Sequence, residues 1–339
     1  MRVLVTGGAG LIGRAAVAEL LETGHEVTVL DRVGELPQPA RGHVRVVTGD
    51  TRDEEIVRRA VAGQERIAHL AAGASFLMYE RDPIKETTGA MAGFHTVIDA
   101  AARANVPRIV YASTSAVYEG NPVPYRETMP LSPPDLKAFA KKVNEEVADL
   151  YRKRYGIETL ALRPFSVYGT DEESKGPYAN VASLFAWAMA AGRRPLLWGD
   201  GDQTRDFIFA DDVAHALRLA LDSSYTGAVN VGTGVETSFF GLISELNRLL
   251  GAELEPEHMD VPISIYASRL LADTSVASET LGFRARVSLT QGLTRTLERV
   301  ASHGSDTRRH LSGLQEAFRH GVTAETLAPH KPGDRLRAA

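Results

Sequence analysis

Three glycines near the start of the chain are spaced for phosphate binding. Gly7, Gly10 and Gly13 follow an apolar run at residues 3–6 and precede an Ala-, Val- and Leu-rich stretch at residues 14–22. In a strand–turn–helix of this kind, the first glycine permits the tight turn, the second lets the backbone approach a pyrophosphate, and the third allows close helix–strand packing. The phosphates then contact free N–H groups at the positive end of the helix dipole. The spacing therefore predicts a dinucleotide site.

Asp31 ends the next apolar run, residues 25–30, where a second strand is expected. A carboxylate at this position can accept hydrogen bonds from both hydroxyls of an adenosine ribose, and it would repel a 2′-phosphate. This favours NAD over NADP as the cofactor. Two alternatives stay open: the neighbouring Arg32 can bind a 2′-phosphate, and Asp31 can be a solvated turn residue.

The order of apolar runs and amphipathic stretches predicts the elements that position these residues. Strands are expected at residues 3–6, 25–30, 44–47, 66–70, 108–112 and 159–162, and helices at 14–22, 53–61, 93–104 and 136–155. Strands that alternate with helices form a parallel sheet covered on both faces. Right-handed crossovers make this an α/β fold with a doubly wound parallel sheet, the Rossmann fold.

The alternation loosens after residue 163, where Pro, Gly and Tyr become frequent. We therefore expect an NAD-binding domain at residues 1–165 and a smaller α/β substrate-binding lobe at 166–302. A strand and a helix within 205–225 are expected to return to the first domain. Residues 303–339 mix Arg, His, Gly and Pro, and we expect them to form a peripheral tail.

Composition excludes several classes of protein. The 339 residues carry 38 basic and 43 acidic side chains, a net charge of −5, which argues against nucleic acid or an anionic membrane as a partner. The absence of cysteine excludes thiolate nucleophiles and iron–sulfur clusters, and the ten histidines lack a metal-binding spacing, so no metal is expected. No apolar run reaches about 18 residues and no secretory signal is recognisable, so we expect a cytoplasmic protein.

Motifs across most of the chain resemble those of the extended short-chain dehydrogenase/reductases, in particular the NAD-dependent epimerases and dehydratases that act on sugar nucleotides. Besides the glycine turn, these motifs lie at residues 49–53, 69–72, 111–118, 162–169, 199–207, 230–234, 272–275 and 281–283. The resemblance implies that further residues contact NAD, namely Leu11, Ile12, Asp50, Thr51, Leu70, Ala71, Ala72, Lys141 and Phe165. It also implies substrate contacts from Ser75, Ser113, Ser115, Ser166, Tyr178, Arg205 and Arg269.

The resemblance also implies a mechanism, in which NAD takes a hydride from a sugar carbon while a tyrosine takes the hydroxyl proton. A lysine four residues later lowers the tyrosine pKa and holds the nicotinamide ribose, and a Ser or Thr hydroxyl bonds the same sugar oxygen. Thr114 and Lys141 match this hydroxyl and this lysine, but Lys137 stands where the family has the tyrosine. Ser115 and Ala116 stand where dehydratases carry Asp and Glu, which disfavours dehydration.

Lys137 can act in three ways. Beside Lys141, and partly desolvated by NAD and substrate, its ammonium would have a lowered pKa, and the neutral amine can accept an alcohol proton as a general base. It can instead bind an anionic group of the substrate as a cation, or it can have no catalytic role. Thr114, Lys137 and Lys141 are the predicted catalytic residues.

Other side chains on the substrate side also have two interpretations each. Arg205 is expected to clamp a diphosphate, since a guanidinium matches phosphate oxygens bidentately; the alternative is a salt bridge to Asp206 or a glutamate. Ser113 and Ser115 flank Thr114 and can be structural or can contact the substrate. Trp198 is interpreted as a core residue.

These features favour an NAD-dependent sugar-nucleotide epimerase with an atypical active site, which oxidises a hydroxyl transiently and returns the hydride. A dehydrogenase or reductase of a sugar nucleotide or polyol is the alternative within the same enzyme class. A catalytically inactive dinucleotide-binding sensor or scaffold is the alternative outside it. The resemblance further implies a homodimer in which helices 93–104 and 136–155 pair across a two-fold axis, with the apolar positions Val97, Ala101, Val143, Val147 and Leu150.

Overall fold

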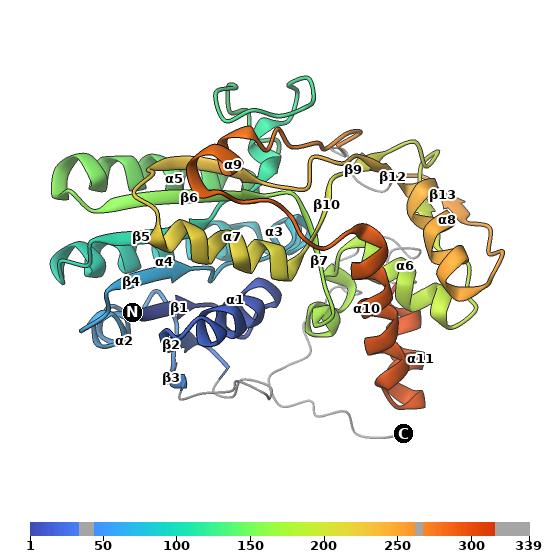
Figure 1. Ribbon diagram of the computed structural model, residues 1–339, viewed down its shortest axis with the longest axis horizontal. Helices are drawn as coiled ribbons and strands as arrows, with labels where there is room; N and C mark the ends of the chain where they lie inside the picture. The colour runs from blue at the N-terminus through green and yellow to red at the C-terminus, as the bar shows by residue number, and fades with distance from the viewer. Residues whose placement is uncertain (34–43, 262–266, 316–339) are drawn as a thin grey trace.

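The computed structural model describes residues 1–33, 44–261 and 267–315. Its centre is a seven-stranded sheet in the order β11-β6-β5-β4-β1-β2-β3, with every neighbouring pair parallel (Figure 1). The strands are β1 (Arg2–Thr6), β2 (Glu26–Asp31), β3 (Val44–Thr48), β4 (Arg66–His69), β5 (Arg108–Ala112), β6 (Glu158–Pro164) and β11 (Gly227–Val231). The predicted doubly wound parallel sheet is confirmed, and β11 is the strand of this sheet that the sequence analysis does not predict.

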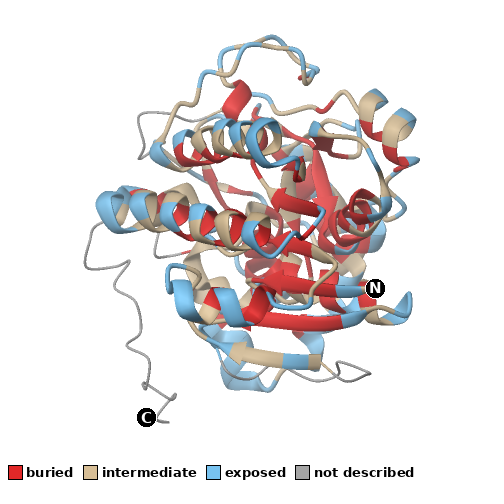
Figure 2. Cartoon of the chain, turned by 90° about the vertical axis from the view of Figure 1, so that its left-hand side faces the viewer, coloured by how far each residue is buried: buried red, intermediate tan, exposed pale blue. Residues whose placement is uncertain are grey.

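Helices cover both faces of this sheet (Figure 1). One face carries α1 (Leu11–Glu22), α7 (Ala210–Asp222) and α9 (Ser275–Leu281), and the other α2 (Glu54–Val61), α4 (Pro83–Arg103) and α5 (Leu136–Tyr155). Successive side chains of a strand point to opposite faces, so Val3 and Val5 pack in the first core and Leu4 in the second. Figure 2 shows the buried strands between helices whose outer sides are exposed.

Helix α4 begins at Pro83, well before the predicted helix at 93–104. Asp82 caps it by accepting a hydrogen bond of 3.3 Å from the N–H of Lys85, and Pro83 occupies the first turn, where its missing N–H is not needed. Ile84 in this turn is 79% exposed, so the turn lacks the apolar pattern that reveals the rest of the helix. The short helix α3 (Phe76–Arg81) precedes it.

A smaller lobe of short strands and helices lies at the carboxyl ends of the sheet strands (Figure 1). Its strands pair as β7 (Ser166–Tyr168) with β10 (Phe207–Phe209), β8 (Leu196–Trp198) with β13 (Glu257–Met259), and β9 (Thr204–Arg205) with β12 (Thr237–Ser238). Its helices are α6 (Val181–Ala190), α8 (Phe239–Leu250), α10 (Leu289–Ser302) and α11 (Ser305–Gly313). Phe185, Phe207 and Leu242 belong to the core that these elements share. Two 3-10 turns, η1 (Ser115–Tyr118) and η2 (Glu172–Tyr178), complete the connections.

Residues 205–225 were expected to return both a strand and a helix to the first domain, but only the helix does so. Helix α7 does pack against α1, with Val213 and Leu217 in the shared core. Strand β10, however, pairs with β7 outside the seven-stranded sheet. The strand that joins the sheet is β11, beside β6 and later in the chain.

Within the expected peripheral tail, residues 304–310 are exposed, but residues 311–315 pack on the smaller lobe. Leu311 and Leu314 are 2% and 9% exposed and contact a cluster that includes Trp187 and Leu196. Leucines three positions apart lie on one side of a helix, which gives this segment a buried face. The remainder of the tail, 316–339, lies outside the described residues. Along the described chain, none of the helices combines the length and apolar character needed to cross a membrane.

Candidate active site

The glycine turn between β1 and α1 has the close packing that a dinucleotide site needs. Gly7 has φ +74°, a left-handed conformation that favours glycine, and a Cβ there would lie 2.7 Å from the N of Ala71. A Cβ on Gly13 would lie 2.0 Å from the carbonyl oxygen of Gly7. Gly10 is the N-cap of α1 and supplies no capping side chain, so the first N–H groups of the helix face the turn without one. This cradle fits a pyrophosphate.

Asp31 lies at the end of β2 beside this turn. Its Oδ2 accepts a hydrogen bond of 2.9 Å from the N–H of Ala9, and its Oδ1 accepts one of 3.1 Å from the N–H of Val33. Each carboxylate oxygen keeps a further lone pair, so two ribose hydroxyls can still donate to it. The neighbouring Arg32 is exposed.

Asp50 and Thr51, which the resemblance assigns to NAD, lie after β3. Asp50 pairs with Arg52 at 2.8 Å, and this hydrogen-bonded guanidinium lowers the pKa of the carboxyl to about 2. Thr51 packs against Gly93 of α4, where a Cβ would lie 2.5 Å from the threonine Oγ1. Thr51 therefore packs the loop after β3 against α4, whereas Asp50 bonds within the loop.

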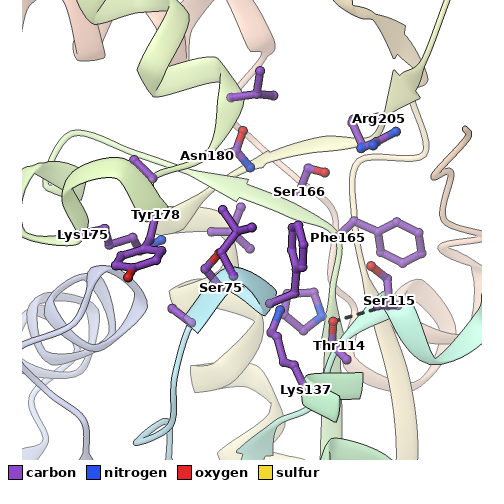
Figure 3. A pocket seen from close by; sticks show the side chains of 18 of the residues that line it. Ser75, Thr114, Ser115, Lys137, Phe165, Ser166, Lys175, Tyr178, Asn180 and Arg205 are labelled. Atoms are coloured by element: carbon purple, nitrogen blue, oxygen red, sulfur yellow. Dashed lines mark hydrogen bonds between the residues drawn. The ribbon is translucent and has the colours of Figure 1, made fainter. Parts of the chain in front are cut away.

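A cavity of about 690 Å³ lies between the sheet and the smaller lobe (Figure 3). The sequence-predicted residues that line it are Ile12, Leu70, Ala72, Ser75, Ser113, Thr114, Ser115, Lys137, Lys141, Phe165, Ser166, Tyr178 and Arg205. The other predicted residues are not part of its lining in the described chain: Gly7, Gly10, Leu11, Gly13, Asp31, Arg32, Asp50, Thr51, Ala71 and Arg269. All of these except Arg269 are assigned to the cofactor and belong to the first part of the chain.

Lys141 is held at the base of the cavity by the backbone of β5. Its side chain is 4% exposed, and Nζ donates a hydrogen bond of 2.8 Å to the carbonyl oxygen of Ala112. Burial and the neighbouring Lys137 cation lower the pKa of this ammonium to about 7, while Glu145 opposes the shift. Both forms of this amine are therefore accessible near neutral pH.

Lys137 lies one turn earlier on α5 and lines the same cavity. Desolvation lowers the pKa of its ammonium, Lys175 lowers it further, and Asp135 opposes both. Asp135 is fixed as the N-cap of α5, where it accepts a hydrogen bond of 2.8 Å from the N–H of Ala138. In Figure 3, Lys137 and Thr114 lie next to each other at one side of the pocket. The setting favours a neutral amine on Lys137 more than solvent does.

Thr114 and Ser113 have different surroundings although they are adjacent. Thr114 Oγ1 accepts a hydrogen bond of 3.3 Å from the N–H of Ala116, at the start of η1, and its hydroxyl proton remains available to the cavity. Ser113 Oγ donates to Glu145 at 2.5 Å. Glu145 also accepts hydrogen bonds of 2.9 and 2.5 Å from Arg163. Ser113 therefore belongs to a buried structural network, whereas Thr114 is placed to bond a substrate oxygen.

Tyr118 is a phenol near the site in sequence, but it does not line the cavity. Its hydroxyl donates to Asn230 at 2.8 Å and accepts from Arg163 at 2.5 Å, and the side chain is fully buried. Burial raises the pKa of this phenol to about 12. Tyr178 does line the cavity, from the smaller lobe, and Arg81 donates to its hydroxyl at 3.3 Å.

Of the two arginines predicted to contact the substrate, Arg205 lines the cavity and Arg269 does not. Arg205 is 7% exposed and lines the cavity, with its guanidinium carbon 5.2 Å from the centre of the Phe239 ring. Asp206, its alternative partner, instead accepts hydrogen bonds from the backbone of Thr233 and Gly234, at 2.8 and 2.9 Å. Arg269 has a 55% exposed side chain and forms a bidentate pair with Glu236, at 2.8 and 2.6 Å.

The cavity also contains residues that sequence reasoning did not assign to it. Glu119, at the end of η1, lines it; burial raises the pKa of its carboxyl, Asp135 adds to the shift and Arg205 opposes it. Trp198, interpreted as a core residue, lines it as well, and so does Gln315. Glu119 directly follows the motif at residues 111–118, so its place was open to prediction. No sequence signal marks Gln315.

The lining changes in character from one end of the cavity to the other. Hydroxyl and ammonium groups from η1 and α5 gather near the sheet, and Arg205 lies across the pocket from them (Figure 3). Apolar and aromatic side chains from the smaller lobe form the other end, namely Leu184, Phe185, Leu196, Trp198 and Phe239. This arrangement suits an elongated ligand with a polar reacting end, an anionic middle and a planar apolar end. Within the described residues, no cluster of His, Asp and Glu is arranged to hold a metal ion.

Known proteins share both the sequence and the architecture. The model of the family described as "NAD dependent epimerase/dehydratase family" matches residues 3–232. A UDP-glucose 4-epimerase of Mycolicibacterium smegmatis is 35% identical over 309 residues, which cover 88% of this chain and 98% of that protein. The solved UDP-glucose 4-epimerase of Thermotoga maritima, with UDP-glucose, has a TM-score of 0.83 at 29% identity over 89% of this chain and 99% of that one. The UDP-glucose 4-epimerase of Thermus thermophilus, in complex with NAD, has a TM-score of 0.81 at 30% identity over 90% and 100%.

Proposed function

The chain belongs to the NAD dependent epimerase/dehydratase family, and we propose that it epimerises a UDP-sugar by transient oxidation of one hydroxyl. It is an enzyme of this family and NAD is its cofactor. The observation that carries the proposal is the meeting of Thr114, Lys137 and Lys141 in one cavity, next to the glycine turn. The relatives named as UDP-glucose 4-epimerases support a UDP-sugar as the substrate.

The cofactor's binding residues follow from the geometry of the turn. Gly7, Gly10 and Gly13 would hold the pyrophosphate, because the turn is packed closely and leaves the backbone accessible. Asp31 would hold the adenosine ribose, because each of its carboxylate oxygens keeps a lone pair for a ribose hydroxyl. Lys141, at the base of the cavity, would hold the nicotinamide ribose. NAD, when bound, supplies the acceptor for one hydride and later its donor.

Lys137 is the proposed general base. Its neutral amine takes the proton of the sugar hydroxyl as the hydride leaves the same carbon, which gives a ketone, and its ammonium returns the proton after the hydride is delivered to the opposite face. The lowered pKa of Lys137 supports this role, because only the neutral amine can accept a proton. Thr114 donates its hydroxyl proton to the same sugar oxygen and orients it. This is the atypical feature of the proposed site.

The substrate's orientation follows from the changing character of the cavity. The sugar lies at the Thr114 and Lys137 end, the diphosphate at Arg205, and the base against the apolar end with Trp198. Ser115 and Ala116 carry no acid or base for elimination, which favours epimerisation over dehydration.

A homodimer is part of the proposal. Of the five apolar positions expected at its interface, Val97 and Ala101 are fully buried in the sheet core, so they do not serve a partner. Leu150 on α5 is 63% exposed, and Phe139 and Tyr155 on the same helix are 46% and 52% exposed. The exposed apolar side chains of α5 support a partner helix there.

Incubation with NAD and one UDP-hexose, followed by nuclear magnetic resonance of the sugar, tests the proposed function. We expect the epimer to accumulate to equilibrium with catalytic NAD and without net change of the nicotinamide absorbance. A rise of that absorbance in step with substrate use would instead indicate a dehydrogenase. Binding of NAD without any turnover would indicate a sensor or scaffold.

A further inference from the structure

Gln315 joins the C-terminal segment to the wall of the substrate cavity. Its side chain is 4% exposed and lines the cavity. Oε1 accepts a hydrogen bond of 3.0 Å from the N–H of Leu196, and Nε2 donates one of 2.8 Å to the carbonyl oxygen of Arg194. Leu196 is the first residue of β8 and Arg194 lies two residues before it, so the orientation of the amide is fixed by the backbone that leads into this strand, and Leu196 itself lines the cavity.

The segment that carries Gln315 is anchored by apolar packing. Leu311 and Leu314 pack with Leu184, Trp187 and Leu196, and Trp198 contacts the same cluster. Figure 1 shows α11 in the smaller lobe, where it follows α10 and packs against α6. Gln315 is therefore held at the apolar end of the cavity, away from the lysines of α5.

A side-chain amide has two N–H donors and an oxygen with two lone pairs. The described chain uses one donor and one lone pair of Gln315, in the bonds to Arg194 and Leu196. Among the described residues, one N–H donor of Gln315 therefore has no partner, and the cavity that Gln315 lines also carries Leu196, Trp198 and Tyr178. Because most of this wall is apolar, a single oriented donor there fixes the orientation and the identity of a bound ring.

We propose that Gln315 recognises the nucleobase of the substrate by donating its remaining N–H to the 4-carbonyl oxygen of uracil. The inference rests on the proposed function for the orientation of the substrate, with the base at the apolar end. Cytosine carries an amino group where uracil carries its 4-carbonyl, so a donor at this position favours UDP over CDP. Gln315 is a specificity residue that the C-terminal segment contributes, and it takes no part in proton or hydride transfer.

The test is calorimetric titration of the NAD-loaded full-length protein with UDP and with CDP. Gln315→Leu removes the amide, and Gln315→Glu keeps an acceptor for the N–H of Leu196 but removes the donor. Arg308→Ala, on the exposed side of α11, is the matched control. Thermal unfolding and NAD affinity are measured for each variant to show that it is folded.

We expect the wild type to bind UDP about tenfold more tightly than CDP, the size of one hydrogen bond of about 1.4 kcal/mol. Both Gln315 variants should bring this ratio close to one, and Arg308→Ala should leave it unchanged. An unchanged ratio in folded Gln315 variants overturns the inference. So does a uniform loss of affinity for both nucleotides, because that result indicates a purely structural role. Turnover of a UDP-hexose by the wild type is measured separately. A failure of the proposed function would appear in that turnover, whereas a failure of this inference would appear in the ratio of UDP to CDP affinity.

Discussion

Nζ of Lys141 lies 2.8 Å from the carbonyl oxygen of Ala112, to which it donates a hydrogen bond. The bond ties α5 to the carboxyl end of β5, two residues before Thr114, so the hydroxyl and the two lysines of α5 are positioned by one contact. It also holds a buried cation one helical turn from Lys137. Desolvation lowers the pKa of both ammonium groups, and repulsion from Lys137 lowers that of Lys141 further.

The first prediction concerns Lys137 as the base. Lys137→Met keeps the length of the side chain and removes the amine, and turnover should fall by about 10²–10⁴-fold, the usual share of a positioned proton transfer. NAD affinity should hardly change, because the glycine turn and Lys141 bind the cofactor. Steady-state kinetics and cofactor titration measure the two effects. A raised Michaelis constant at unchanged turnover would instead identify Lys137 as an anion-binding residue.

The pH profile gives the same prediction a second readout. Since the pKa of Lys137 is lowered and only the neutral amine acts as base, turnover should rise as pH increases through that pKa, below the ordinary range of lysine. Lys137→Tyr should retain part of the activity, because a phenol is the group that the family has at this position. A turnover number that is flat with pH in the wild type would contradict the assignment.

The second prediction concerns the glycine turn. Gly13→Ala places a Cβ 2.0 Å from the carbonyl oxygen of Gly7, so the helix must move, and we expect a loss of about 1–3 kcal/mol in stability together with weak NAD binding. Gly89→Ala is the control: Gly89 lies within α4 and an added Cβ meets nothing within 4 Å. That variant should be neutral or slightly stabilised. Thermal unfolding and NAD titration check both, and normal NAD affinity in Gly13→Ala would refute the role of the turn.

The third prediction concerns the choice of cofactor. The wild type should bind NAD more tightly than NADP, because Asp31 bonds the ribose hydroxyls and repels a 2′-phosphate. Asp31→Ser should weaken NAD binding by about tenfold or more, the loss expected when hydrogen bonds to a charged group are removed. The ratio of NAD affinity to NADP affinity should fall. Glu26→Gln, at the other end of β2, should change neither affinity. Calorimetry with both cofactors decides, and tighter NADP binding by the wild type would transfer the role to Arg32.

The fourth prediction concerns assembly. Leu150→Lys places a charge on the exposed face of α5, where the side chain is 63% exposed, and should convert a dimer into a monomer. Val235→Lys alters a side chain that is 62% exposed but lies outside α4 and α5, and it should leave the dimer intact. Light scattering at micromolar concentration measures the mass. A monomeric wild type would rule out the dimer.

Much of the fold could be predicted because its signals are local. The turn from Gly7 to Gly13 and the carboxylate of Asp31 are marked by a few adjacent residues, and apolar runs indicate six strands of the sheet. The seventh, β11, was missed because its place beside β6 depends on a contact between distant parts of the chain. The first ten residues of α4, 83–92, were missed, and at its start Asp82 and Pro83 determine the helix without an apolar pattern.

The site shows the same division between local and long-range information. Thr114 and Lys137 lie in short motifs, and both line the cavity. Arg269 also lies near a motif, yet Glu236 pairs with its guanidinium, and only the folded chain shows this pair. Gln315 reaches the cavity because two leucines dock α11 on the smaller lobe, a contact that no nearby sequence pattern indicates.

The central claim is that one hydride leaves a sugar carbon and returns to the same carbon on its other face. A UDP-hexose with deuterium on the reacting carbon, incubated with enzyme and NAD in ordinary water, tests this directly. The account predicts that the epimer forms and retains the deuterium on that carbon, because the hydride never exchanges with solvent. Loss of the deuterium to water, or accumulation of reduced cofactor in place of an epimer, would contradict it.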